Sequence, residues 1–288
     1  MTKYTKPAEI YFSDTMNKSP ELSIIITSYK NPAVLRLCLE SLKKNVLCKN
    51  YEILVLDSST EEDTEMMMRE EFPQTRFFSH SENLGFAKLV NQGLKKAKGD
   101  FLLILNADII IEKKSADILI DYLKANPSVG IAGPKLLNFD GQVQPSRFRF
   151  YTPLIILLRR TPLGRLAFAK KKIDRFLYKN ADPSKPQEVD WIMGSAMMTR
   201  QETAKKVGLM EENFGFMYFE DVDWCRRFWE NGLKVVFYPY VKMFHYHGKG
   251  SASQSALKAV FLNKLTREHI KSALKYFWKY LGKPNPHR

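Results

Sequence analysis

The chain lacks the features that mark secreted, membrane-spanning and disulfide-rich proteins. It has only three cysteines, Cys38, Cys48 and Cys225, at spacings that fit neither a disulfide framework nor a metal site. No run approaches the roughly 18 to 20 apolar residues that a transmembrane helix needs. Residues 1–20 are polar and mixed in charge, unlike a secretory signal. We therefore expect a cytoplasmic protein with reduced thiols.

Acidic residues are also in short supply. The chain has 31 aspartates and glutamates against 45 lysines and arginines, which gives a formal net charge of +14. Such an excess suits a nucleic acid, an anionic membrane surface or a negatively charged substrate. The 288 residues, 44% of them hydrophobic and 12% aromatic, are enough for one large globular domain or one domain with appendages.

The first half alternates strand and helix patterns. Short apolar runs, rich in β-branched residues, predict strands over 22–27, 51–56, 76–79 and 101–105. Amphipathic spacing predicts helices that start near Ala33 and extend over 61–71, 83–98 and 114–126. This order predicts an α/β fold with a mostly parallel sheet and right-handed crossovers.

Polar residues follow the predicted strands. Asn106 and Asp108 flank Ala107 directly after the fourth strand, while Asp57 and Asn83 follow the second and third. The carboxyl ends of parallel strands meet at one edge, where open α/β sheets bind their ligands. An aspartate there suits a hard divalent cation that is shared with substrate phosphates. Each residue alone could belong to an ordinary polar turn, but their convergence on one edge favours a site.

The second half predicts a less regular series of elements: a strand over 129–134, a hairpin over 136–150 that turns at Asp140–Gly141, strands over 188–200 and 233–238, and a long helix over 256–281. The strand over 188–200 is interrupted at Gly194–Ser195. A glycine at such an interruption permits the close approach of a ligand to the backbone.

Residues 153–180 mix leucines and isoleucines with arginines and lysines, and only Asp174 offsets their charge. Such a segment can lie in a membrane interface and contact anionic headgroups. It is also compatible with a surface helix that packs its leucines on the core and exposes its charges. The helix predicted over 256–281 leaves the same two interpretations open: an element facing a membrane or partner, or a docked terminal helix.

Three acids, Glu220, Asp221 and Asp223, stand among aromatic residues at a predicted helix start. The aromatic neighbours and the like charge of Glu220 would raise the pKa of Asp221, which makes this residue our candidate general base. Acids in a first helical turn also favour the positive end of the helix dipole without any catalytic role.

Seven motifs in one order carry a family resemblance: LSIIITSYKNPAVLRLCLESL, EILVLDSS, NLGFAKLVNQG, GDFLLILNAD, VDWIMGSAMMTR, FMYFEDVDWCRR and FHYHGKGS. Over roughly residues 22–251 the chain resembles the glycosyltransferase family 2 enzymes with a Rossmann-like GT-A fold, especially their rhamnosyltransferase-like branch. The resemblance implies an inverting hexosyltransferase that uses dTDP-rhamnose or a UDP-sugar with Mg²⁺ or Mn²⁺. The implied acceptor is a hydroxyl of a cell-surface glycan or a lipid-linked glycan.

The motifs also imply roles for single residues. The implied catalytic base is Asp221, and the implied metal ligands are Asp108 and His245, with His247 as an alternative. The implied acceptor and sugar site comprises Trp191, Gly194, Ser195 and Glu220. The implied donor site comprises Thr27, Tyr29, Asn31, Asp57, Asn83, Gly85, Phe86, Asn91, Asn106, Ala107 and Asp108.

Three positions depart from the family pattern. Asn106 replaces the first acid of the metal motif, a substitution that the rhamnosyltransferase-like branch shares. Lys30 and Ser58 each replace an asparagine near the expected nucleotide base. Of the remaining basic residues, Lys249, Lys88 and Arg147 are candidates to hold the diphosphate or the acceptor, although exposed lysines usually have no such role.

The domain organisation follows from these motifs. We predict a lead-in over 1–21, a GT-A domain over 22–251 with a nucleotide-sugar-binding half (22–134) and an acceptor half (135–251), and a C-terminal helical extension over 252–288. We expect an enzyme at the inner face of the cell membrane, in peripheral contact with anionic lipid and without a nucleic-acid partner. The alternative function is a non-catalytic module that binds a nucleotide sugar.

Overall fold

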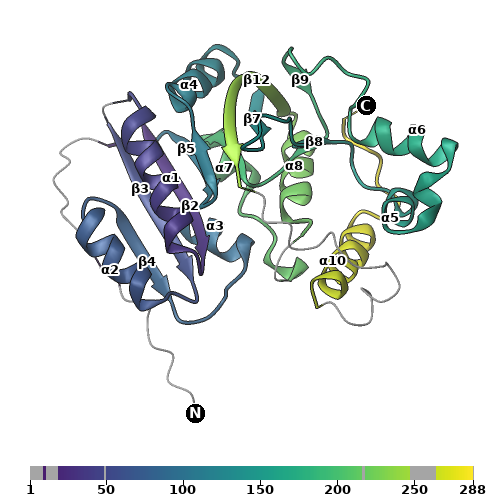
Figure 1. Cartoon of the computed structure of the whole chain (residues 1–288). Helices are drawn as coiled ribbons and strands as arrows, with labels where there is room; N and C mark the ends of the chain where they lie inside the picture. The colour runs from purple at the N-terminus through teal and green to yellow at the C-terminus, as the bar shows by residue number, and fades with distance from the viewer. Residues whose placement is uncertain (1–8, 11–18, 49, 216–217, 247–263, 288) are drawn as a thin grey trace.

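The computed structural model of the protein describes residues 9–10, 19–48, 50–215, 218–246 and 264–287. In this part of the chain a ten-stranded sheet has the strand order β1-β4-β3-β2-β5-β11-β7-β12-β6, with β9 beside β12. Helices cover both faces of this sheet (Figure 1). The predicted α/β class, with a central sheet between helices, is confirmed.

The four strands predicted in the first half form a parallel unit. They are β2 (Leu22–Tyr29), β3 (Tyr51–Ser58), β4 (Arg76–His80) and β5 (Phe101–Asn106). The helices between them are α1 (Pro32–Asn45), α2 (Glu62–Glu71) and α3 (Phe86–Lys96). The predicted order and type of all seven elements are confirmed.

The unbroken apolar runs of these strands are explained by burial on both faces. Ile25 of β2 and Ile104 of β5 belong to one hydrophobic cluster, while Ile24 and Leu103 belong to the other. Since neighbouring side chains of a strand point to opposite faces, a strand covered on both sides needs an apolar residue at every position.

Two layers of helices produce this burial. α1, α2 and α4 (Ser115–Ala125) pack on one face of the sheet. α3, α7 (Gln201–Val207) and α8 (Glu220–Glu230) pack on the other. The remaining helical elements of the described chain are α5 (Pro153–Arg160), η1 (Pro162–Arg165), α6 (Ala167–Phe176), η2 (Glu212–Phe214) and α10 (Lys264–Lys279), and Figure 1 shows α5, α6 and α10 beyond α8.

The second half of the chain extends the same sheet with both orientations. β11 (Ala196–Arg200) is antiparallel to its two neighbours, β5 and β7 (Val129–Leu137). β12 (Lys234–His245) then runs parallel to β7. Three short strands complete the sheet: β1 (Glu9–Ile10), β6 (Ile109–Ile111) and β9 (Gln187–Glu188).

The hairpin predicted over 136–150 is only partly present. Its turn forms, and Gly141 adopts a φ of 82°, but the second arm contributes a single bridge between Leu137 and Val143. The chain then leaves β7, and β8 (Arg147–Phe148) pairs with β10 (Trp191–Ile192). Stacking of Phe148 on Trp191, with ring centroids 4.4 Å apart, accounts for this choice because it buries two large rings together.

The predicted domain boundaries stay a prediction, since one sheet runs through both proposed halves of the 22–251 unit. Residues 256–263 of the predicted C-terminal helix lie outside the described residues. No helix in the described part of the chain is both long and apolar enough to cross a membrane.

Candidate active site

The carboxyl ends of β3, β2 and β5 bring predicted site residues into one row. Ser28 is in register with Asp57, and Thr27 is in register with Asn106. The Thr27 hydroxyl donates to Asn106 Oδ1 over 3.2 Å, and the backbone N–H of Ala107 donates to Thr27 O over 3.0 Å. The edge predicted from the strand ends is therefore present.

Asp57 carries two carboxylate oxygens that are buried without a hydrogen-bond partner among the described residues. The residue is only 1% exposed, and burial raises the pKa of its carboxyl. The Ser28 hydroxyl is also unpartnered within the described chain. Buried polar atoms without partners are rare in proteins, so this pair is suited to hydrogen bonds with a bound ligand.

Asp108 and His245 face each other beyond the end of β5. His245 is the last residue of β12, and its Nε2 lies 3.4 Å from Asp108 Oδ1, a buried oxygen that has no hydrogen-bond partner among the described residues. The other ring nitrogen, Nδ1, is 2.8 Å from Gln144 Oε1. Gln144 therefore orients the imidazole, as outer-shell partners do for metal-ligating histidines.

This arrangement fits a divalent cation that is shared with a substrate. The described residues contain no group of three or more histidines, cysteines, aspartates or glutamates that could hold a metal by themselves. Mg²⁺ is commonly bound by one or two carboxylates together with substrate phosphates, and Mn²⁺ accepts a nitrogen ligand as well. His247 and Lys249 lie outside the described residues.

A short chain of hydrogen bonds connects this edge to the start of α8. The backbone N–H of Asn106 donates to Ser195 O over 2.9 Å. Two peptides closer to the N-terminus, the N–H of Gly194 donates to Asp221 Oδ2 over 3.0 Å. Residues that are far apart in sequence, 106 and 221, are thus placed on either side of one dipeptide. The Ser195 hydroxyl is buried there without a partner in the described chain.

Gly194 is the point at which three elements touch. A Cβ at this position would lie 2.9 Å from the Phe86 ring at the start of α3 and 3.3 Å from the Asp221 Cβ. The glycine is needed for the close approach of these two side chains, and the predicted approach of a ligand to its backbone stays a prediction. It follows that Phe86, Gly194 and Asp221, all predicted from motifs, are neighbours.

Replacement of Gly194 by alanine should displace Phe86 or Asp221 by a few tenths of an ångström or more. We expect turnover to fall roughly 10- to 100-fold, since small misplacements of reacting groups have effects of this size. Steady-state kinetics together with the melting temperature would measure it.

The matched control is Gly130→Ala, which also introduces a clash, with Phe228 and Leu233, but away from this edge. It should lower the melting temperature while folded molecules keep their turnover. Equal losses of turnover per folded molecule in the two variants would show that Gly194 matters only for stability.

Glu220 and Asp221 form a coupled pair of carboxyls at the start of α8. Burial raises the pKa of both, and the hydrogen bonds from the N–H groups of Gly194 and Val222 lower that of Asp221. The like charge of Asp221 raises the pKa of Glu220, which is the more buried of the two at 6% exposed, whereas the prediction had placed this effect on Asp221. Glu220 therefore keeps its proton to higher pH, and Asp221 is the carboxylate of the pair.

The turn that leads into α8 is strained. Tyr218 and Phe219 adopt φ values of 86° and 75°, in the left-handed region that bulky residues rarely occupy. Strained backbone of this kind is found disproportionately at functional sites. Here the strain aims the first turn of the helix, and with it Asp221, toward Gly194.

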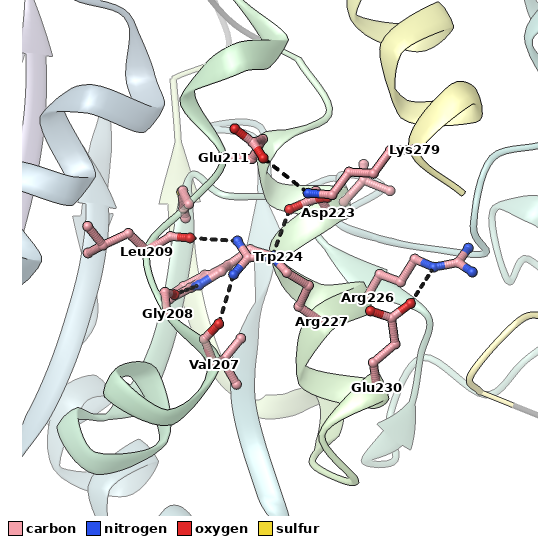
Figure 2. Close-up of polar contacts among 12 residues, drawn as sticks. Val207, Gly208, Leu209, Glu211, Asp223, Trp224, Arg226, Arg227, Glu230 and Lys279 are labelled. Atoms are coloured by element: carbon pink, nitrogen blue, oxygen red, sulfur yellow. Dashed lines mark hydrogen bonds and ion pairs between the residues drawn. The ribbon is translucent and has the colours of Figure 1, made fainter. Parts of the chain in front are cut away.

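Buried ion pairs hold α8 in place from its other side (Figure 2). Asp223 is fully buried and binds Arg227 Nε over 2.8 Å and Lys279 Nζ of α10 over 2.7 Å. Arg227 also donates to the carbonyls of Val207 and Leu209. This answers part of the question left open for the acids of this motif: Asp223 has a structural role, which is distinct from that of Asp221.

Comparison with known proteins identifies the family. The profile of glycosyl transferase family 2 matches residues 23–208, more than half of the chain. The chain belongs to this family. It is therefore a glycosyltransferase, and the predicted membership is confirmed.

Two rhamnosyltransferases are among its relatives. It is 26% identical over 220 residues to the N-acetylglucosaminyl-diphospho-decaprenol L-rhamnosyltransferase of Mycobacterium tuberculosis, which covers 72% of this chain and 71% of that protein. It is 28% identical over 200 residues to rhamnosyltransferase WbbL of Escherichia coli, with 69% of each chain covered. The similarity supports the rhamnosyltransferase-like branch that the motifs indicated.

A solved structure supports the fold. The crystal structure of GalNAc-T7 with UDP, GalNAc and Mn²⁺ superposes with a TM-score of 0.60 at 15% identity. The match covers 92% of this chain but only 57% of the longer GalNAc-T7 chain. The predicted GT-A fold is confirmed by this likeness, which at such low identity concerns the fold alone.

Some residues of this glycosyltransferase lie elsewhere than their predicted roles suggest. Asn91 is 1% exposed, and its amide is occupied by Met210 and Glu212, so it supports a loop. Trp191 is buried, and its indole N–H donates to Arg149 O. Neither side chain is placed to contact a donor or acceptor directly.

The loop after β2 and the basic candidates are also placed by the structure. Asn31 caps α1 by accepting from the N–H of Val34, while Tyr29 is exposed at the strand end and free to cover a ligand. Lys88 is exposed on α3. Arg147 is buried and packs over the Phe237 ring, and its candidate role at the diphosphate stays a prediction.

Asn83 and Gly85 shape the turn before α3. The Asn83 side chain accepts from the N–H of Gly85 over 3.0 Å, and Gly85 has a φ of 81°, which favours glycine. Together they set the direction in which the helix start, with Phe86, meets Gly194.

Two residues near the glycosyltransferase site were not predicted. Gln144 lies three residues beyond the predicted hairpin turn, and nothing in the surrounding sequence indicates a role beside His245. Tyr151 packs between Phe219 and Trp191, with ring centroids 5.0 and 5.6 Å away, and the negative charge of Asp221 is among the influences that raise the pKa of its phenol after burial. Its aromatic character was the available signal.

Two half-open hollows on the described part of the chain lie away from these residues. One, of about 200 Å³, is lined by Tyr122 and Lys234, and the other, of about 280 Å³, by Asp100 and Arg200. Both lie at the amino ends of β5, β7 and β12, where α/β folds rarely place active sites. The chemistry of the carboxyl edge, rather than the hollow volume, marks the site.

Proposed function

We propose that the protein is an inverting, metal-dependent glycosyltransferase that moves a hexose from a nucleoside-diphosphate donor to a hydroxyl of a glycan. The observation that supports it is the hydrogen-bonded dipeptide Gly194–Ser195, which joins the metal motif at Asn106 to the acid at Asp221. A transferase of this kind needs a cation at the leaving diphosphate and a base at the acceptor on two sides of one sugar.

In this proposal Asp221 takes the proton of the acceptor hydroxyl as that oxygen attacks the anomeric carbon. The N–H groups of Gly194 and Val222 each hold one of its oxygens and keep the carboxylate oriented. Glu220, protonated beside it, keeps the pair at a single negative charge. Attack opposite to the leaving diphosphate inverts the anomeric carbon.

Asp108 and His245 would hold Mg²⁺ or Mn²⁺, which as a Lewis acid offsets the charge of the departing diphosphate. The unpartnered oxygens of Asp57 and the Ser28 hydroxyl would bind the nucleotide base. Thr27, Tyr29 and the turn at Asn83–Gly85 would complete the donor site.

We propose dTDP-rhamnose as the first donor to test and a UDP-sugar as the second, because both curated relatives described above are named rhamnosyltransferases. The mycobacterial relative is named after N-acetylglucosaminyl-diphospho-decaprenol, a lipid-linked sugar, which supports a lipid-linked acceptor here. We also propose a cytoplasmic location, in line with Cys38, Cys48 and Cys225, all of which are free thiols.

A panel of nucleotide sugars tests this proposal. A ligand that binds only the native state raises the melting temperature, so we expect one donor to do so with Mn²⁺ and less without it. That donor should then transfer its labelled sugar to a lipid-linked glycan acceptor, and NMR of the product should show an inverted anomeric centre.

The outcomes separate the two functions under consideration. A donor that stabilises the protein but is never transferred to any glycan acceptor would favour the non-catalytic binding module. Retention of the anomeric configuration would contradict the role given to Asp221, because that role requires a single displacement.

A further inference from the structure

α10 carries an apolar stripe that faces away from the protein. Trp278 is 81% exposed, and Leu274 and Leu281 are 65% and 74% exposed. Ile270, Leu274 and Trp278 recur every four positions and so share one face of α10, and Leu281 follows in the turn just beyond the end of the helix. Single exposed leucines are common, but a row of them that includes an exposed tryptophan marks an interaction surface.

The stripe is held rigidly, since the opposite face of α10 is fixed to the core. Tyr276 is buried against Phe219, and the Tyr280 hydroxyl donates to Asp223 over 2.7 Å. Lys279 completes this attachment through its ion pair with Asp223, which Figure 2 shows. The exposed stripe is therefore a second apolar face and not one side of a loosely attached helix.

A second exposed apolar row lies on the neighbouring helical segment. Part of residues 153–180 does pack on the core, as the surface-helix interpretation expects, and Ile155, Leu158 and Phe176 are buried. Five other large apolar side chains of the segment are exposed: Leu154, Leu157, Leu163, Leu166 and Phe168. The surface-helix interpretation thus fits the buried face of the segment, and the exposed apolar face is the one that the membrane interpretation concerns.

The two rows belong to one region of the molecule. In Figure 1, α5, α6 and α10 gather at the end that is farthest from α1 and α2. His269 of α10 is close enough to Arg160 and Arg159 of α5 for their positive charges to add to the effect of burial, which lowers its pKa to about 4.

Basic side chains surround this apolar surface. The exposed lysines and arginines of the two segments are Arg159, Arg160, Arg165, Lys170, Lys171, Lys172, Arg175, Arg267, Lys271 and Lys275. Within α5–α6 and the part of α10 whose side chains are described, the acids are Asp174 and Glu268, and each is in an ion pair with a lysine. Apolar residues with an interfacial tryptophan and a cationic border complement an anionic lipid surface.

We infer that the exposed faces of α5, η1, α6 and α10 form one docking surface for an anionic lipid bilayer. We call it the lipid-facing surface. This inference extends the proposed function. It rests on that function in one respect only, namely that the acceptor is lipid-linked.

The lipid-facing surface adjoins Asp221, the proposed catalytic base. His269 contacts Tyr218 and Phe219, the two strained residues directly before Glu220, with ring centroids 4.8 and 5.4 Å apart. On the α5 side, Arg159 donates to the Tyr151 hydroxyl over 3.1 Å, and Tyr151 packs on Phe219. A bilayer bound here would present a lipid-linked hydroxyl to the Asp221 side of the site, while the donor edge at Asp57 stays toward the aqueous phase.

Vesicle flotation with the whole purified protein tests the inference, with no donor and no acceptor present. We expect the protein to float with vesicles of equimolar phosphatidylcholine and phosphatidylglycerol, and much less with phosphatidylcholine alone or at high salt. The double variant Leu274→Ser/Trp278→Ser should reduce the floated fraction about tenfold or more, because burial of either apolar side chain favours the bound state. Leu154→Ser/Leu157→Ser should reduce it as well.

The matched control is Leu37→Ser/Met66→Ser, which alters two apolar residues of α1 and α2 that are each 51% exposed. It should float like the wild type. Melting temperatures of all variants should stay close to that of the wild type, since the altered side chains are exposed.

Three results would overturn the inference. The wild type could fail to float with anionic vesicles, or the control could lose as much binding as the α10 variant. The third is a wild-type dimer in sedimentation equilibrium that Leu274→Ser/Trp278→Ser dissociates, which would make the surface a contact between two copies of the chain. Flotation without sugar transfer would contradict the proposed function alone, and transfer without flotation would contradict the lipid-facing surface alone.

Discussion

Asp221→Asn should reduce sugar transfer by roughly 100- to 10,000-fold, the range that general acid–base catalysis contributes. The amide keeps the shape of the side chain, and its single oxygen can still accept from one of the N–H groups of Gly194 and Val222, but it cannot take a proton at neutral pH. Donor binding should be unchanged, because the base acts on the acceptor. Initial rates of transfer and the donor-induced shift in melting temperature measure the two effects separately.

The pH profile gives a second readout for the same residue. Burial raises the pKa of the Asp221 carboxyl, and the base works only when deprotonated, so the wild-type kcat/KM should fall as the pH drops through that raised pKa. The residual activity of Asp221→Asn should lack this acidic limb. The control Asp121→Asn alters an exposed acid on α4 and should keep both the rate and the profile. Substantial transfer by Asp221→Asn, with an unchanged acidic limb, would assign the base to another group.

Asp108→Ala should have the second largest effect. Removal of the only charged ligand proposed for the cation should lower transfer by roughly 100-fold or more, since a metal contributes several kcal/mol of charge stabilisation in the transition state. The wild type should lose activity in EDTA and regain it with Mn²⁺ or Mg²⁺. Titration of activity against Mn²⁺ concentration measures the effect, and the midpoint should rise strongly in the variant.

Two further variants make the metal prediction specific. His245→Ala should raise the Mn²⁺ midpoint less than Asp108→Ala, because a neutral ligand contributes less charge. Asp57→Asn should raise the KM for the donor without moving the Mn²⁺ midpoint, because its oxygens face the nucleotide side. Wild-type activity that survives EDTA would contradict the assignment of Asp108 and His245. So would a raised Mn²⁺ midpoint in Asp57→Asn together with an unchanged midpoint in the Asp108 and His245 variants.

The parallel half of the fold was accessible from the sequence for a simple reason. The strands β2, β3, β4 and β5 show their burial directly as unbroken apolar runs, and Ile24–Ile26 is a good example. A single crossover rule then places every strand end at one edge. The position of Asp57, Asn106 and Asp108 along this edge follows from local pattern plus handedness, although their roles as ligand contacts stay a prediction.

The acceptor side was less accessible, because it depends on long-range pairing. The interruption at Gly194–Ser195 was visible, but periodicity does not reveal which strands β11 joins or in which direction it runs. Its antiparallel insertion between β5 and β7 is what carries Ser195 to Asn106 and Gly194 to Asp221. The same limit explains why the hairpin over 136–150 was predicted with too long a second arm.

Side-chain direction was the third quantity that pattern alone could not supply. Asn91 belongs to a family motif, yet its amide is used by Met210 and Glu212. Repulsion in the acidic pair was predicted to raise the pKa of Asp221, but it raises that of Glu220, which is the more deeply buried carboxyl.

By itself the sequence determined the α/β class, the family and the strand ends at which polar residues collect, because these depend on local periodicity and on motifs of contiguous residues. Only the tertiary structure decided how the two halves meet at Gly194, which acid of the pair is the carboxylate, and that α10 turns a second apolar face outward. Those features depend on distances between residues that are remote in the chain, and on which of two apolar faces finds a partner, neither of which a linear pattern contains.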